Sequence, residues 1–378
     1  NYIYFFRIPM QILHRYFLLK GSEIMEEKII NTLKDLLKYK TYDGNKDEFE
    51  KIFKYIKGKM NGDLFIKEYV FNGYKNLVIS NTLEKELDII FCGHIDVVPA
   101  NSYEFSEDSE NIYGRGTIDM KGGVAVMLEV FNNISTNKKI ALFITSDEEI
   151  GGMCVEELLK IYKASLAIIP DGGKNFNLIY EEKGLFQLEL SLKGISSHSS
   201  QPFNGDNAIV NLFNVYQKML KKYPLPKSPS EYVTSINLSM IEGGTAINQV
   251  PNYATMKLDI RHVAKDKKED FIKLIKKINK DVEIKVLLEG SVFETDLSNK
   301  NIIKYLEVCK DVLKDEVEIV GCESTSDGVY FSNLGIPTII MNPVGYYPHC
   351  PNEYVNKKSL EKLYFIYKEF LEESDFYV

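Results

Sequence analysis

Residues 89–99 read IIFCGHIDVVP, an apolar run that ends in a histidine and an aspartate. The first three residues have the composition of a buried strand. His94 and Asp96 follow two positions apart, so their side chains leave the strand end on the same face. A metal-bound imidazole usually has its second ring nitrogen held by a carboxylate, and this pair supplies both groups. A core histidine bonded to a turn is an equally good explanation of the spacing alone.

Two further apolar strands end in carboxylates. Residues 140–152 read IALFITSDEEIGG and place Glu148 and Glu149 after a buried strand, and residues 166–173 read LAIIPDGG and place Asp171 there. Acids crowded beside a strand end repel one another unless a positive charge compensates them. Adjacent glutamates point in different directions, so one can bind a metal while the other carries a proton. An acidic, solvated loop is the alternative, but its position directly after an apolar strand disfavours that reading.

A glycine-rich turn and a late loop add two more candidate ligands. Residues 113–123 read YGRGTIDMKGG, and this is no dinucleotide fingerprint, because Asp119 stands where the third glycine is required. Such a turn can present a carboxylate to a cation, although a helix N-cap is the alternative for Asp119. Residues 347–353 read YPHCPNE and supply His349. Two imidazoles and three carboxylates form the donor set of a paired zinc site with a bridging carboxylate: His94, Asp119, Glu149, Asp171 and His349.

The order of periodic segments predicts an α/β fold whose central sheet is covered on both faces. Helical periodicity and short β-rich runs alternate along the first half of the chain. The helices are expected at 29–37, 49–56, 121–133 and 155–162, and the strands at 65–70, 76–80, 88–92, 140–145 and 166–169.

The middle of the chain has a different pattern. Apolar and polar residues alternate over 186–192, as in a strand with one solvated face. The segments that follow give the order β-α-β-β-α-β, a ferredoxin-like unit. They are a helix at 206–222, strands at 233–240 and 253–261, a helix at 268–279 and a strand at 282–288. Because an α/β pattern resumes at 301–313 and 338–341, this unit is predicted to be an insertion at 184–290.

Composition excludes several classes of function. The 378 residues are 44% hydrophobic and 26% charged, with a net charge of -8, so the chain lacks the basic surface that nucleic acid or anionic membranes attract. Five cysteines occur without a C-x-x-C spacing, which disfavours a disulfide framework and a zinc knuckle. We therefore expect a cytoplasmic protein without a nucleic-acid or membrane partner.

Residues 1–24 form an apolar and aromatic leader. Arg7, Pro9, His14 and Arg15 interrupt each run before it reaches the length of a membrane helix, and no small-residue cleavage site follows. We expect this leader to be non-native or disordered, with the native protein starting at Met25.

Seven motifs occur in one order between Met25 and the C-terminus. They are GHIDVVP, YGRGTIDMKGG, TSDEEIGG, PDGG, SSHSSQP, LDIRH and PHCPNEYV. In these motifs the sequence resembles the dizinc aminoacylase and exopeptidase family, which includes succinyl-diaminopimelate desuccinylase, acetylornithine deacetylase, carboxypeptidase G and the di- and tripeptidases. The resemblance implies a zinc-exopeptidase-like α/β catalytic domain in residues 25–183 and 291–378. It also implies that residues 184–290 are a ferredoxin-like α+β lid and dimerisation domain.

The resemblance also implies two zinc ions per subunit, for which cobalt or manganese can substitute. His94 and Asp171 would bind one ion, Glu149 and His349 would bind the other, and Asp119 would bridge them.

Catalytic roles follow from the same resemblance. Asp96 would orient His94, and Glu148 would be the general base that takes a proton from water and returns one to the leaving amine. Water between two zinc ions loses its proton near neutral pH, which makes a nucleophile available.

Three residues of the lid complete the expected site. His198 would reach the active site of the partner subunit and stabilise the oxyanion, and Asn248 and Arg261 would contact the substrate carboxylate. Alternatives remain open: His198 can cap the turn that follows it, and Arg261 can pair with Asp259.

The motifs divide on the substrate. The segment 324–328 looks like that of desuccinylases, 198–202 and 207–209 look like those of acetylornithine deacetylases, and 182–184 resembles the peptidases. At the positions equivalent to 182–184 desuccinylases normally carry Arg-Arg-Gly, whereas this chain has Glu-Lys-Gly. We expect a cytoplasmic, homodimeric hydrolase of N-acyl amino acids in amino-acid biosynthesis, of desuccinylase or deacetylase type. A di- or tripeptidase is the alternative, and a catalytically silent relative that binds amino-acid derivatives is a third.

Overall fold

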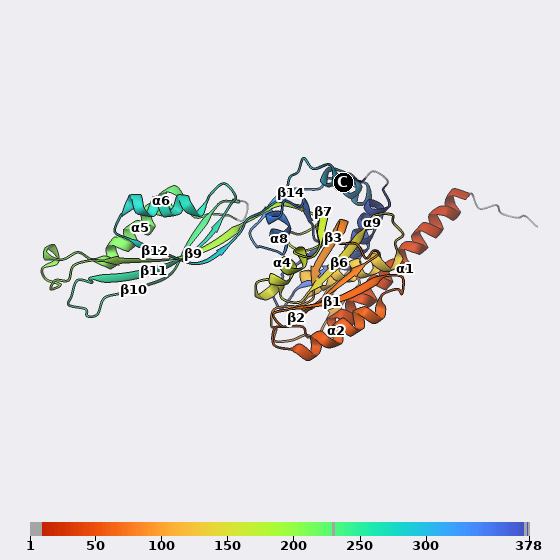
Figure 1. Ribbon diagram of the computed structural model, residues 1–378, viewed down its shortest axis with the longest axis horizontal. Coiled ribbons are helices and arrows are strands. Elements are labelled where there is room, and N and C mark those ends of the chain that lie inside the picture. Colours follow the sequence, from red (N-terminus) through yellow and green to blue (C-terminus); the bar gives the residue numbers. More distant parts are fainter. Residues whose placement is uncertain (1–9, 229–230, 374–375, 377–378) are drawn as a thin grey trace, which may run out of the picture. The chain divides into compact units, whose positions relative to one another are not determined.

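The computed structural model describes residues 10–228, 231–373 and 376 and divides the chain into two compact units (Figure 1). The first unit takes the residues up to 179 together with 296–320 and those from 326 onward, and the second takes 180–295 and 321–325. Helix α1 (Met10–Leu37) begins before Met25. The predicted leader therefore overlaps this helix from Met10, whereas residues 1–9 lie outside the described residues, and the origin of the leader stays a prediction.

A mixed sheet organises the first unit, in the order β1-β2-β6-β3-β7-β15. Strands β3, β6, β7 and β15 run parallel, and β2 and β1 extend the sheet as an antiparallel edge. Parallel strands end at the same edge, so the loops after β3, β6 and β7 meet there. The strands are β1 (Phe65–Phe71), β2 (Tyr74–Ser80), β3 (Glu86–His94), β6 (Ile140–Thr145), β7 (Lys163–Ile169) and β15 (Thr338–Ile340).

Helices cover both faces of this sheet because alternate residues of its buried strands point to opposite sides. On one face Phe91 meets Tyr367 of helix α9, with ring centroids 5.2 Å apart. On the other face Phe143 meets Tyr162, just beyond helix α4, at 5.4 Å. The helices of this unit are α1, α2 (Lys46–Lys59), α3 (Gly122–Asn133), α4 (Met153–Leu159), α7 (Lys300–Leu313), α8 (Gly328–Asn333) and α9 (Lys357–Glu372).

A second, small sheet of the first unit joins segments far apart in the sequence. Its order is β16-β17-β5-β4, and all of its neighbouring strands are antiparallel. Pairing of β5 with β17 brings the turn that follows residue 113 beside the loop that precedes residue 354. The strands are β4 (Ser106–Glu107), β5 (Asn111–Tyr113), β16 (Gly345–Tyr346) and β17 (Tyr354–Asn356).

The second unit is a four-stranded antiparallel sheet with two helices. Its strand order is β10-β11-β9-β12, the order of a ferredoxin-like unit. Phe186 of β9 packs against Phe271 of α6, with centroids 5.1 Å apart, and both side chains are buried. The elements are β9 (Gly184–Lys193), α5 (Ala208–Lys222), β10 (Ser235–Gly243), β11 (Tyr253–His262), α6 (Lys268–Ile278) and β12 (Glu283–Gly290).

Strands β8 (Leu178–Glu182), β13 (Phe293–Glu294) and β14 (Ile319–Cys322) lie where the chain passes between the units. The α/β fold expected from the sequence is confirmed. That the second unit is a lid and dimerisation domain stays a prediction. Within the described part of the chain, none of the helices has both the length and the apolar character that crossing a bilayer requires.

Candidate active site

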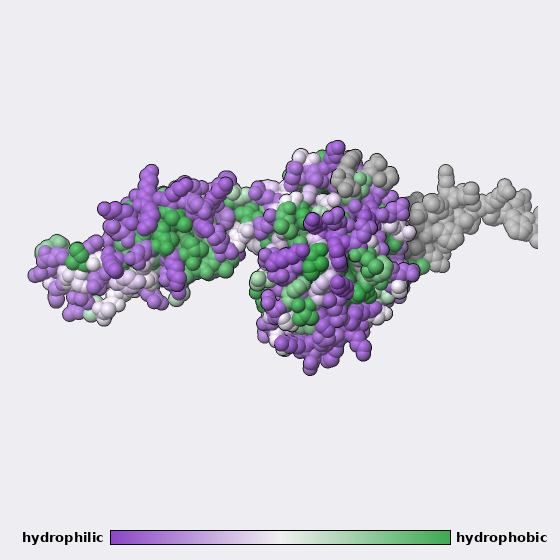
Figure 2. Space-filling model, in the orientation of Figure 1, coloured by the Kyte–Doolittle hydropathy of each residue, from purple (hydrophilic) through white to green (hydrophobic). Residues whose placement is uncertain are grey.

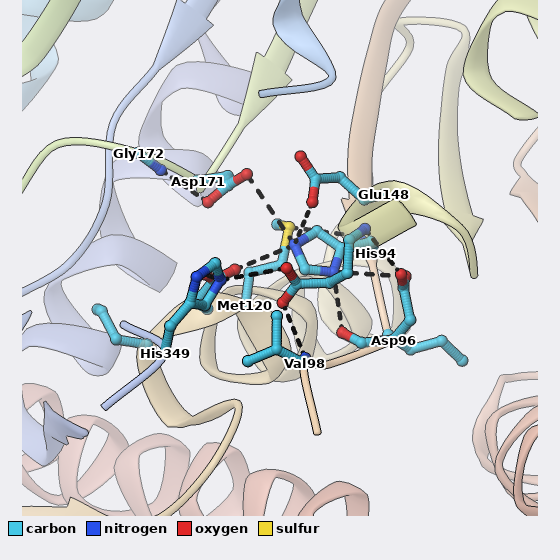
Figure 3. Close-up of polar contacts among 12 residues, drawn as sticks. His94, Asp96, Val98, Met120, Glu148, Asp171, Gly172 and His349 are labelled. Carbon is cyan, nitrogen blue, oxygen red and sulfur yellow. Dashed lines mark hydrogen bonds and ion pairs between the residues drawn. The ribbon is translucent and has the colours of Figure 1, made fainter. Parts of the chain in front are cut away.

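Five side chains predicted as metal ligands lie together in the first unit, in two groups that share one member (Figure 3). His94, at the end of β3, is the centre of the first group. Its Nε2 atom lies 3.1 Å from Asp119 Oδ1 and 4.0 Å from Asp171 Oδ2. Asp171 follows β7, so two strand ends of the main sheet supply this group.

His349 is the centre of the second group. Its Nε2 atom lies 3.1 Å from Asp119 Oδ2 and 3.1 Å from Glu149 Oε2. Asp119 therefore directs one carboxylate oxygen to each imidazole, which is the geometry of a bridging group. Helix α3 has Lys121 at its N-cap and no side-chain cap bond, so Asp119 does not serve as a cap.

The backbone at two ligands takes unusual conformations. His349 has φ 63°, a left-handed value that side chains other than glycine seldom adopt. Gly116, in the turn before Asp119, has φ 84°, and a Cβ there would lie 2.8 Å from Val97 Cγ1, so only glycine fits. The peptide bond from Asp119 to Met120 is cis.

Asp96 contacts both groups. The Nδ1 atom of His94 lies 3.0 Å from the Asp96 backbone oxygen and 3.5 Å from its Oδ1 atom. The backbone carbonyl is thus the nearer acceptor for an Nδ1 proton, which leaves Nε2 as the ligand atom. The Oδ2 atom of Asp96 accepts the backbone N–H of Glu149 at 2.9 Å. Asp96 therefore contacts His94 through its backbone oxygen and the backbone of Glu149 through its carboxylate.

The two adjacent glutamates occupy different places. Glu149 belongs to the second ligand group, and its Oε1 atom also accepts the backbone N–H of Val98 at 3.2 Å. Glu148 belongs to neither group, and its Oε2 atom lies 4.0 Å from His94 Nε2. Burial raises the pKa of Glu148 well above its usual range, although His94 opposes that shift. A buried carboxylate of raised pKa beside the ligands has the properties of a proton carrier.

Crowding of acids dominates the electrostatics. Burial and the neighbouring Asp119 raise the pKa of Asp171 to about 7. Hydrogen bonds to Asp119 and Glu149 raise the pKa of His349 to about 10. Carboxylates packed this closely need positive charge between them, and divalent cations supply it. Two nitrogens and three carboxylates suit zinc and the related divalent metals, so the residues present fit a metal site.

The two imidazoles differ in exposure. The side chain of His94 is 1% exposed, whereas that of His349 is 53% exposed. Solvent therefore reaches the second group on the side of His349.

The sequence of this site matches a known family. The profile of Peptidase family M20/M25/M40 matches residues 90–373, which include all five candidate ligands. The chain belongs to this family. It is a hydrolytic enzyme, and its family's members use a metal.

Individual relatives of this M20/M25/M40 chain have different stated activities. It is 27% identical over 330 residues to a [LysW]-lysine/[LysW]-ornithine hydrolase of Sulfurisphaera tokodaii, covering 85% of this chain and 88% of the relative. It is 28% identical to a succinyl-diaminopimelate desuccinylase of Rickettsia felis, covering 91% and 99%. The crystal structure of a tripeptidase from Staphylococcus aureus superposes with a TM-score of 0.72 at 22% identity, covering 92% and 99%, and shows the same fold.

Three candidate residues of the M20/M25/M40 site lie in the second unit. The Nδ1 atom of His198 accepts the backbone N–H of Ser200 at 3.2 Å and lies 2.8 Å from its hydroxyl. An accepting Nδ1 leaves the proton of the neutral ring on Nε2. His198 therefore caps the turn that follows it through Nδ1, which was the alternative expected from the sequence. This bond leaves the Nε2–H group of the ring as a donor.

Arg261 and Asn248 lie on the same unit. The Nε atom of Arg261 donates to Asp259 Oδ1 at 3.0 Å, the pair foreseen as an alternative to substrate binding. The backbone oxygen of Asn248 accepts the N–H of Ser199 at 3.0 Å, next to His198. Asn248 is thereby fixed beside the histidine.

Sequence reasoning assigned no role to two buried residues beside the ligands. Glu353 is fully buried and pairs with Arg115, and Asp327 is buried near Gly152. Burial raises the pKa of Asp327 well above its usual range. Glu353 and its partner Arg115 stand in motifs quoted above, and Asp327 stands in the segment 324–328, so a charged residue within these stretches was the signal available.

Proposed function

We propose that this protein hydrolyses the amide bond of N-acyl amino acids, with a reaction of the desuccinylase or deacetylase type. The observation that carries the proposal is the Asp119 carboxylate, whose two oxygens each lie 3.1 Å from a different imidazole. One carboxylate shared in this way is suited to two metal ions side by side.

Each group of side chains would hold one metal. His94 and Asp171 would bind the first ion, Glu149 and His349 would bind the second, and Asp119 would bind both. We propose zinc, with cobalt or manganese as substitutes, because the donors are nitrogen and oxygen atoms. Bound metal supplies Lewis acidity, which polarises the scissile carbonyl and lowers the pKa of water.

Proton transfer is the task of Glu148. Its carboxylate lies 4.0 Å from His94 and outside both ligand groups, so it is free to accept a proton from the attacking water. The same carboxyl then protonates the leaving amine, which makes the departure of that amine feasible. Asp96 keeps the His94 ring and the Glu149 segment in place during these steps.

The second unit would supply the oxyanion donor. His198 carries its ring proton on Nε2 because Nδ1 accepts the Ser200 N–H. An N–H donor aimed at the developing oxyanion stabilises the transition state more than the ground state. We propose that His198 acts in the active site of a partner subunit and that Asn248 and Arg261 bind the substrate carboxylate.

Exposed apolar side chains support a homodimer formed through the second unit. Strand β10 is an edge strand, and its Met240 and Ile241 are exposed. Val210 and Phe213 of helix α5 are also exposed, and Figure 2 shows hydrophobic residues at the surface of this unit. An open edge strand with apolar side chains is a surface that proteins usually cover.

The acyl group is the finer part of the proposal. Lys183 stands within the segment where desuccinylases carry two arginines, and it is buried, with its Nζ atom 3.5 Å from Glu323 Oε1. Engaged in this way, it is a poor partner for a second substrate carboxylate. We therefore favour an acyl group without its own charge. We also propose a cytoplasmic location, which suits the five free cysteines.

A di- or tripeptidase is the second candidate. The segment 182–184 resembles that of the peptidases, and the tripeptidase of Staphylococcus aureus shares the fold. A silent binding protein would be expected to lack a ligand or the base, whereas all five candidate ligands and Glu148 are present in this chain.

Amine release from a substrate panel tests the proposal. The full chain is loaded with zinc or cobalt and given N-acetylornithine, other N-acetyl amino acids, N-succinyl-diaminopimelate, and di- and tripeptides, with Glu148→Gln as the blank. Fastest turnover of an N-acyl amino acid supports the proposal, and fastest turnover of peptides replaces it by the second candidate. Metal-loaded protein that turns over none of these substrates refutes both.

A further inference from the structure

Glu353 is a buried carboxylate that the proposed reaction does not use. It is fully buried, four residues after His349 and directly before strand β17. Its Oε1 atom accepts the backbone N–H of Ile118 at 3.1 Å and that of Asp119 at 3.3 Å. Its Oε2 atom accepts from Arg115 Nη1 at 2.7 Å. Each carboxylate oxygen therefore has donors of its own.

These bonds connect two ligand segments that lie far apart in the sequence. The turn at 114–121 presents Asp119, and the loop at 347–353 presents His349. The backbone oxygen of Glu353 also accepts the N–H of Gly114 at 2.9 Å, at the end of the β5–β17 pairing. One residue thus fixes the Asp119 turn through its backbone and through its side chain.

The conformations of the two segments explain why such a connection is needed. The turn contains a left-handed glycine at 116, and the loop contains His349 with φ 63°. Glycine adopts such a φ freely, whereas a residue with a side chain, such as His349, keeps it only where neighbouring contacts hold it. The Oδ2 atom of Asp119 and the Nε2 atom of His349 are 3.1 Å apart, and the two segments must keep these atoms close together.

We propose that Glu353, with Arg115 as its charge partner, is the positioning residue that sets the distance between the bridging Asp119 and His349. The inference rests on the metal site of the proposed function. Glu353 touches neither substrate nor metal, and acts by holding the Asp119 backbone. The guanidinium of Arg115 neutralises the carboxylate, which keeps both oxygens as acceptors inside the protein.

The substitution Glu353→Gln separates this role from simple packing. The amide has nearly the same shape but only one accepting oxygen, so its NH₂ group must face either Arg115 or the two backbone N–H groups. Donor then meets donor, and the turn has to shift. Substitutions of residues that support metal ligands typically weaken metal binding about 10- to 100-fold, and we expect a loss in this range.

Zinc binding is measured directly, without any substrate. Metal-free full-length protein competes with a chromophoric chelator for zinc, and the dissociation constants and the number of bound ions are compared with those of the wild type. The melting temperature of the metal-free protein is recorded in parallel. The control is Glu129→Gln, which alters another buried carboxylate, one that accepts from Thr32 at 2.6 Å and pairs with Lys59 at 2.8 Å.

Weaker zinc binding by Glu353→Gln, with wild-type binding by Glu129→Gln, supports the inference. Unchanged zinc dissociation constants in a folded Glu353→Gln protein overturn it, whatever the melting temperature does. If Glu353→Gln does not fold, Arg115→Met takes its place. It removes only the Oε2 partner, and wild-type zinc affinity in that variant would equally overturn the inference. A wild-type protein that binds no zinc would instead refute the metal site of the proposed function.

Discussion

Replacing Glu148 by glutamine should abolish turnover and leave metal binding intact. Glu148 lies outside both ligand groups, with its nearest carboxylate oxygen 4.0 Å from His94 Nε2. The amide preserves the shape of the side chain but can neither accept a proton from water nor pass one to the leaving amine. The neighbouring substitution Glu149→Gln should do the reverse and remove a metal ligand.

The size of the effect follows from the role. General acid–base catalysis contributes about 10²- to 10⁴-fold to a rate. This range corresponds to about 3–5 kcal/mol of transition-state stabilisation. Because one carboxyl is proposed to serve both proton transfers, the loss in kcat should lie toward the upper end. KM should change little, because Glu148 is not among the residues proposed to bind the substrate carboxylate.

Steady-state amine release and bound zinc are measured on the same preparations of wild type, Glu148→Gln and Glu149→Gln. A Glu148→Gln protein that keeps more than about a tenth of the wild-type kcat would show that another group moves the proton. Loss of zinc from Glu148→Gln, with zinc retained by Glu149→Gln, would exchange the roles of the two glutamates.

Three further predictions address other parts of the molecule. Zinc binding should release protons at pH 7–8 and become tighter as the pH rises. Hydrogen bonds to carboxylates raise the pKa of metal-free His349 to about 10, and the metal must displace that proton. Calorimetry in two buffers of different ionisation enthalpy measures the protons released, and a release of zero would contradict the prediction. Ser200→Ala should lower kcat about two- to tenfold with little change in KM. It removes one of the two hydrogen-bond donors near His198 Nδ1, and such a bond contributes about 0.5–1.5 kcal/mol. Steady-state kinetics test this, with the oligomeric state of the variant measured to show that the dimer is intact. Phe271→Ala should lower the free energy of unfolding by about 3–5 kcal/mol. The Phe271 ring is fully buried, stacks on Tyr223 with centroids 4.3 Å apart and contacts Phe186. A denaturant titration that finds a loss of less than about 1 kcal/mol would contradict the prediction.

Long periodic segments made most of the fold predictable. The strand expected at 140–145 is β6, with identical bounds, and the helix expected at 121–133 is α3, which begins one residue later. Every residue of β6 is buried, and the sequence from Ile140 to Ile144 is an unbroken apolar run. In α3 ten of the twelve residues are buried, which gives it a stronger apolar signal than a surface helix has.

Short strands were missed because they carry no period. Strands β5 and β17 have three residues each, and β16 has two. The pairing of β5 with β17 depends on contacts between residues more than 200 positions apart, which local patterns do not encode. Helix α9 was not assigned either, although Leu360, Leu363 and Tyr367 have helical spacing.

The candidate metal ligands could be predicted from the sequence, but the contacts that hold them in place could not. Ligand types could be listed from the residues that follow each strand, and the structure brings those five side chains together. The contacts of Glu353 could not be foreseen, because they join residues 235 positions apart in sequence. A contact between Asp96 and His94 was expected, but not that the Asp96 backbone oxygen, at 3.0 Å, would be nearer to His94 Nδ1 than the carboxylate, at 3.5 Å.

The shared carboxylate of Asp119 has a thermodynamic consequence. Since one side chain serves both ligand groups, occupancy of either group changes the affinity of the other, and by linkage the two changes are equal. Partial loading therefore does not report two independent constants. A preparation with one ion per chain is a distribution of empty, singly and doubly loaded molecules, whose proportions depend on this coupling. Specific activity should then rise with metal content along a curve rather than a straight line.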